Sequence, residues 1–70
     1  MTIMRLAEVR QHTGRQLTVD EAKTFVSRPH ISVVKAQAAA LSLHSWNNTP
    51  EEWLRLEACL VLIGERRRGG

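Results

Sequence analysis

The segment VSRPHIS at residues 26–32 constrains the fold of this chain more than any other, because its proline separates two stretches of helical pattern. Proline disfavours helical geometry at the residue before it, so a helix that begins near Thr18 is expected to end at about Arg28. Beyond the proline, Ser32 is placed to cap a further helix over residues 33–46. The segment therefore predicts a corner between two helices.

Two capping boxes, each a threonine followed three residues later by a glutamate, mark helix starts. Thr18 with Glu21 predicts the start of the helix before the corner. Thr49 with Glu52 predicts a last helix over residues 50–63 or slightly beyond. In each box the threonine side chain accepts a hydrogen bond from a free backbone amide, and the glutamate accepts one from the amide of the threonine.

Apolar residues recur at helical spacing over residues 3–12, where Gly14 can end a first helix. The last helix is apolar nearly all round after Trp53, so it is expected in the middle of the fold. Seventy residues allow one domain at most. We therefore predict an all-α fold, a small compact bundle of three to four short helices with a helix-turn-helix-like corner. Its single domain is expected over residues 1–64, followed by a flexible basic tail over residues 65–70.

Residue types that support catalysis or metal binding are present without the patterns that such chemistry needs. The single cysteine, Cys59, lies in an apolar run and reads as a buried hydrophobe. His12, His30 and His44 show no metal-ligand spacing. No nucleophilic serine motif and no phosphate-binding glycine loop occurs. We expect a protein that is not an enzyme and that uses no cofactor or metal.

The positive charge of the chain is concentrated at its carboxyl end. The formal net charge is +3, and the three arginines and one glutamate of residues 65–70 account for +2 of it. The body over residues 1–64 is therefore nearly neutral, whereas proteins that grip DNA through many phosphates usually have a basic face. No signal pattern and no apolar run long enough for a membrane span is present, so a soluble cytoplasmic protein is expected.

The corner at residues 26–32 resembles the turn and the start of the recognition helix in bacterial helix-turn-helix regulators. That resemblance would place five side chains at or near DNA, namely Ser27, Arg28, His30, Ser32 and Lys35. Phe25 stands where that family commonly has a glycine, and the alanine-rich helix offers only Gln37 as a good candidate to read bases. A proline-stopped helical corner without DNA binding is the alternative interpretation.

Three segments carry a second resemblance: RLAEVR at residues 5–10, HSWNNTPEEW at residues 44–53, and the arginine-rich end. With its length, they make the chain similar to small bacteriophage transcription regulators of the Xanthomonas phage type, which bind host RNA polymerase. The resemblance implies a protein in the cytoplasm of a bacterial host that inhibits initiation and promotes antitermination. It would do so by docking on polymerase subunits, without catalysis.

Arginine and tryptophan are the side chains most enriched where proteins bind one another. Trp46 ends the third expected helix and is the better candidate of the two tryptophans for an interface anchor, while packing of both as core is the alternative. The full set of partner-binding candidates is Arg5, Arg10, Arg15, Arg28, His30, Lys35, Trp46, Arg66, Arg67 and Arg68. Protein binding, with bacterial RNA polymerase as partner, is the leading hypothesis. Direct DNA binding and self-association are the alternatives.

Overall fold

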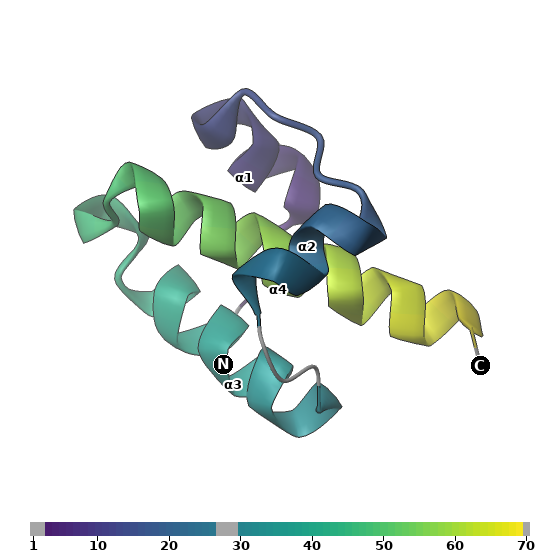
Figure 1. Ribbon diagram of the computed structural model, residues 1–70. Helices are drawn as coiled ribbons and strands as arrows, with labels where there is room; N and C mark the ends of the chain where they lie inside the picture. Colours follow the sequence, from purple (N-terminus) through teal and green to yellow (C-terminus); the bar gives the residue numbers. More distant parts are fainter. Residues whose placement is uncertain (1–2, 27–29, 70) are drawn as a thin grey trace.

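The computed structural model describes residues 3–26 and 30–69, and within them it contains four α-helices, one short 3-10 helix and no strand (Figure 1). The elements follow in the order α1 (Leu6–Thr13), α2 (Val19–Phe25), α3 (Ile31–Leu43), η1 (Ser45–Asn47) and α4 (Pro50–Gly69). The predicted all-α bundle is confirmed.

The long helix α4 runs through the middle of the molecule; in the view of Figure 1, α1 lies above it, α3 lies below it and α2 crosses in front of it. All the extensive contacts between the described helices involve α4. Leu56, Ala58 and Cys59 on this helix are completely buried. The predicted central position of the last helix is therefore confirmed, and its physical reason is the nearly continuous apolar surface of α4.

Both predicted capping boxes are present. The Thr18 hydroxyl accepts from the Glu21 amide at 3.2 Å, and the Glu21 carboxylate accepts from the Thr18 amide at 3.0 Å. Thr49 and Glu52 repeat the arrangement at 3.2 and 2.9 Å. The hydrogen bonds from the threonine backbone amide, and then from its hydroxyl, hold the pKa of each glutamate below its usual value of 4.5.

The first helix is shorter than the sequence predicted. It starts at Leu6 rather than at residue 3, because Arg5 is extended and supplies no side-chain cap. Residues 3–5 before this helix form an amino-terminal arm. The arm contacts α3, because the Met4 amide donates a hydrogen bond to Ser42 Oγ at 3.1 Å. Gly14 ends the helix as predicted, with a φ of 66° that a residue with a Cβ adopts only under strain.

The third helix begins earlier than predicted and ends earlier. Its N-cap is His30 rather than Ser32, and the His30 ring accepts from the Ser32 amide at 3.4 Å. The helix stops at Leu43, and a separate 3-10 turn follows it. The corner residues 27–29, which include two predicted DNA contacts, Ser27 and Arg28, lie outside the described residues.

The carboxyl end differs from the expected flexible tail. The helix α4 continues through Gly69, so residues 65–69 of the expected tail are helical. Arginines in the last turns favour this conformation because cations stabilise the negative end of the helix dipole. Arg68 also pairs with Glu65 one turn earlier, at 3.6 Å.

A buried carboxylate ties the first connection to the central helix. Glu57 on α4 is completely buried. It accepts hydrogen bonds from the Leu17 amide at 2.7 Å, from Thr13 Oγ1 at 2.5 Å and from Arg10 Nε at 3.4 Å. The apolar pattern of this helix gave no sign of such a role, because all three donors lie 40 or more residues away in the sequence.

Candidate partner-binding surface

The helix α3 exposes apolar side chains along its outer face. Val33 and Leu43 are 44% and 66% exposed, and Ala36 and Ala40 between them are exposed as well. Their spacing of three, four and three residues places all four on one face of a helix. We call Val33, Ala36, Ala40 and Leu43 the outer face of α3.

The opposite face of α3 is apolar too. Val34 and Ala38 are completely buried against the rest of the bundle, and Leu41 is half-buried. A helix that is apolar on both faces is typically covered on both. Within the described residues the bundle covers only one face of α3, so the other is left to solvent.

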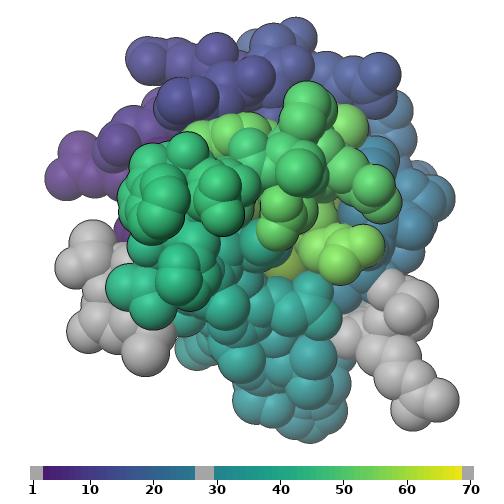
Figure 2. Space-filling view, turned by 90° about the vertical axis from the view of Figure 1, so that its left-hand side faces the viewer, coloured from purple at the N-terminus to yellow at the C-terminus, as the bar shows by residue number. Residues whose placement is uncertain are grey.

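Trp46 follows α3 in the sequence, in the 3-10 turn η1, and is 83% exposed. The turn is held in place by the Asn48 side chain, which donates to the Leu41 carbonyl at 3.0 Å, and by the Asn47 amide, which donates to His44 at 2.9 Å. Figure 2 looks onto this end of the molecule, where the residues of the α3–α4 corner lie at the centre. An ordered turn therefore presents an exposed indole.

The two tryptophans differ sharply in environment. Trp53 is half-buried and stacks on His12, with ring centroids 4.0 Å apart and planes 5° from parallel. A shallow hollow of about 250 Å³ is lined by both tryptophans, and also by Met4, His12 and Ser45. Trp53 packs against α1 and the hydrophobic core, and Trp46 has the exposure that an interface anchor needs.

The basic candidates do not form one patch. Arg10 is engaged with Glu57, and Arg68 with Glu65. Arg28 lies outside the described residues. Four further candidates are exposed, but none of them lines the hollow beside Trp46. They are Arg15, His30, Arg66 and Lys35.

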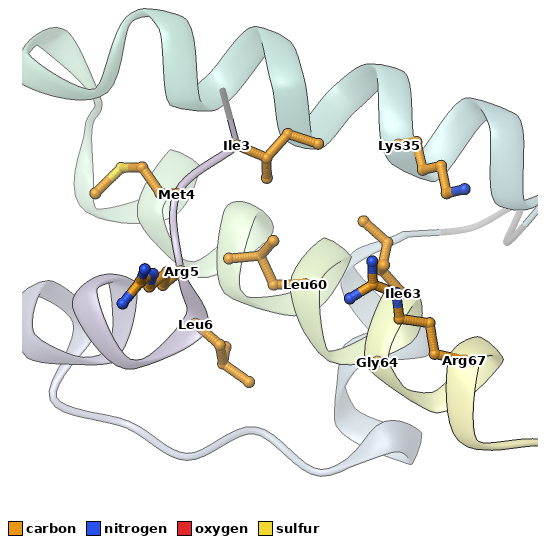
Figure 3. Close-up of a pocket in the computed structure, with 9 residues that line it drawn as sticks. All are labelled: Ile3, Met4, Arg5, Leu6, Lys35, Leu60, Ile63, Gly64 and Arg67. Carbon is orange, nitrogen blue, oxygen red and sulfur yellow. The ribbon is translucent and has the colours of Figure 1, made fainter. Parts of the chain in front are cut away.

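Three basic candidates line one hollow elsewhere on the surface. Arg5, Lys35 and Arg67 line a hollow of about 460 Å³ between the amino-terminal arm, α3 and the last turns of α4 (Figure 3). Its apolar part includes Ile3, Leu60 and Ile63. We call this the basic hollow. Figure 3 shows that its three cationic side chains come from three different segments of the chain.

The described residues contain three histidines, one cysteine and several carboxylates. No cluster of three or more histidine, cysteine or acidic side chains is arranged to hold a metal ion there. Burial raises the pKa of the Cys59 thiol to about 11, and the effect of Arg55 in the opposite direction is smaller. The thiol therefore stays protonated at neutral pH, which makes it a poor nucleophile.

Among the described helices, none combines the length and the apolar character required to cross a membrane.

The sequence interpretation missed the outer face of α3, although a signal for it was present. The four apolar residues recur at helical spacing, but the buried set Val34, Ala38 and Leu41 does so as well. A helical wheel shows two apolar faces without telling which one the bundle covers. That choice depends on how α3 docks on α4.

Comparisons of this chain with protein-family models, with curated proteins and with solved structures gave no match.

Proposed function

We propose that this protein is a non-enzymatic transcription regulator that acts by binding another protein, with bacterial RNA polymerase as its partner. In this proposal the outer face of α3 and Trp46 dock on the polymerase, inhibiting initiation and promoting antitermination. One observation carries the docking step: a helix that is apolar on both faces leaves one face open and leads into an 83% exposed tryptophan. The resemblance to small phage regulators supports the choice of partner.

The energetics of the exposed residues favour a protein partner. Burial of apolar surface stabilises a complex by about 25 cal/mol per Å², and tryptophan is among the side chains that most often dominate a binding interface. Ala36 and Ala40 add little bulk between Val33 and Leu43, so a partner helix can approach the backbone of α3 closely. Leu43 and Trp46 then supply the larger contacts at one end.

The same surface is poorly suited to read DNA. Direct readout needs hydrogen-bonding side chains in the major groove, whereas the outer face of α3 consists of valine, alanine and leucine. A recognition helix is also supported by the helix before it, but α2 and α3 each make their extensive contacts with α4. These observations favour the protein-binding hypothesis over direct DNA binding.

The test is equilibrium binding of the purified full chain to purified bacterial core RNA polymerase. Trp46→Ser is expected to weaken binding about 30-fold, the effect of losing a hot-spot side chain. Gln16→Ser, an exposed substitution in the α1–α2 loop away from this surface, should leave the affinity unchanged. Promoter initiation and terminator read-through in vitro then report inhibition and antitermination.

Three outcomes would contradict the proposal. The polymerase fails to bind; or Trp46→Ser and Gln16→Ser bind it equally well; or the protein binds duplex DNA with an affinity that falls steeply with salt and does not respond to Trp46→Ser. Light scattering on the free protein addresses self-association. A dimer that Trp46→Ser dissociates would assign the exposed surface to a second copy instead.

A further inference from the structure

The basic hollow combines three cations with an apolar floor. Arg5 comes from the amino-terminal arm, Lys35 from α3 and Arg67 from α4, and none of them forms an ion pair within the described residues. No acidic side chain lines the hollow. Ile3, Leu60 and Ile63 supply apolar surface between the cations (Figure 3). Positive charge is therefore concentrated around this hollow, as it also is around a neighbouring hollow lined by Arg10, Arg67 and Arg68.

Such a hollow favours a ligand that has two properties, negative charge and apolar surface. Charges of one sign around a low-dielectric depression reinforce each other and attract carboxylates. The apolar floor is stabilised only when an apolar group covers it. A matching ligand therefore carries several negative charges around at least one apolar group.

The shape of the surface favours an extended chain. A second, mostly apolar hollow of about 580 Å³ shares Ile3 and Lys35 with the basic hollow and continues along α3 to Leu43. The two hollows adjoin each other at Ile3 and Lys35, and the second is lined by Ala36, Ala40 and Leu43 of the outer face of α3. An extended segment of polypeptide can reach both hollows, whereas a compact ligand would fill only one.

We propose that the basic hollow binds an acidic peptide segment of a partner protein. One apolar side chain of that segment covers Ile3, Leu60 and Ile63, and carboxylates on either side of it pair with Arg5, Lys35 and Arg67. The inference goes beyond the proposed function, because it concerns the chemistry of the bound segment and does not depend on which protein carries it.

Nucleic acids and fatty acids fit less well. Single-stranded nucleic acids bind through base stacking on aromatic side chains, and no aromatic residue lines the basic hollow. Phosphates gain nothing from an isoleucine and leucine floor. A fatty acid has a single carboxylate, which cannot engage cations that come from three separate segments.

The test is a titration of the isotope-labelled full chain, followed by the backbone amide signals. The probe is a short synthetic peptide in which leucines alternate with pairs of glutamates. We expect saturable shifts at Ile3, Leu60 and Ile63. Replacing the leucines of the peptide by serine, or its glutamates by lysine, should remove these shifts.

Lys35→Glu and Lys23→Glu form a matched pair, because both lysines are exposed on helices and both changes alter the net charge equally. Lys35→Glu is expected to weaken peptide binding about fivefold. Lys23 does not line the hollow, so Lys23→Glu should change the affinity less than about twofold, through screened long-range repulsion alone.

Four results would overturn the inference. The peptide produces no saturable shifts; or the serine peptide binds as well as the leucine peptide; or Lys23→Glu weakens binding as much as Lys35→Glu; or an oligonucleotide or dodecanoate shifts the same amides at lower concentration than the peptide. Polymerase binding without peptide binding would defeat this inference alone. Peptide binding without polymerase binding would defeat only the proposed function.

Discussion

The helices α3 and α4 are both apolar on more than one face, yet the apolar residues of α4 are covered far more completely. Leu56 on α4 is completely buried, whereas Leu43 on α3 is 66% exposed. The difference follows from the number of helices available. Because α1, α2 and α3 each pack on α4, no further helix among the described residues covers the outer face of α3 (Figure 1). One helix thus stabilises the fold, and the other leaves apolar surface exposed to solvent.

The largest expected effect on stability is that of a substitution in the buried helix α4. Leu56→Ala removes a completely buried side chain and leaves a cavity, so it should lower the free energy of unfolding by about 2–5 kcal/mol. Denaturant unfolding followed by circular dichroism measures the change. Leu56→Met, which nearly conserves volume, is the control and should cost less than about 1.5 kcal/mol. A small loss for Leu56→Ala would show that α4 is not the core helix.

The next largest loss of stability is expected at Glu57, which is a completely buried carboxylate among the apolar residues of α4. Glu57→Ala leaves the buried Leu17 amide without its acceptor, which is expected to cost about 1–3 kcal/mol in urea unfolding. Glu57→Gln keeps an acceptor oxygen and should lose less. If the alanine and glutamine variants are equally stable, the Leu17 hydrogen bond contributes little.

The fold was predictable where its causes are local in sequence. The threonine–glutamate boxes and Gly14 act on amides within one turn, so their residue types alone indicated where helices begin or end. Glu57 was not predictable, since its Leu17 partner is 40 residues away and becomes adjacent only in the folded chain. The candidate site was predictable only in part. The tryptophans were recognised as a pair, but the exposure of Trp46 and the stacking of Trp53 on His12 depend on tertiary packing.

The starts of the two helices should also differ in strength. Thr49→Ala removes a full capping box from α4 and is expected to cost about 1 kcal/mol. His30→Ala removes a long 3.4 Å contact with the Ser32 amide and an exposed 2.8 Å contact between the His30 ring and Ser32 Oγ, so its effect should be a few tenths of a kcal/mol. Thermal unfolding of the two variants side by side measures the contrast. Equal losses would show that the His30 ring caps α3 as well as a threonine does.

The capping boxes predict a modest dependence of stability on pH. The pKa of Glu52 is lower in the folded chain than its usual 4.5, so the unfolded chain takes up protons first as the pH falls. The contribution of this glutamate is therefore complete above about pH 4.5 and is lost as the pH falls through the lowered folded value. Unfolding of the wild type and of Glu52→Gln between pH 7 and pH 3 measures it. The variant should show the shallower decline, and parallel curves would contradict the assignment.

The smallest effect on stability is expected for a substitution in the exposed face of α3. The same substitution is expected to have a large effect on binding. Leu43→Ser removes apolar surface that already faces solvent, so the free energy of unfolding should change by less than about 0.5 kcal/mol. The same substitution should weaken polymerase binding about tenfold, because in the complex that surface is buried. Denaturant unfolding and equilibrium binding measured on one preparation separate the two quantities. A stability loss as large as that of Leu56→Ala would mean that the outer face of α3 is covered in the free protein, and the contrast between α3 and α4 would then disappear.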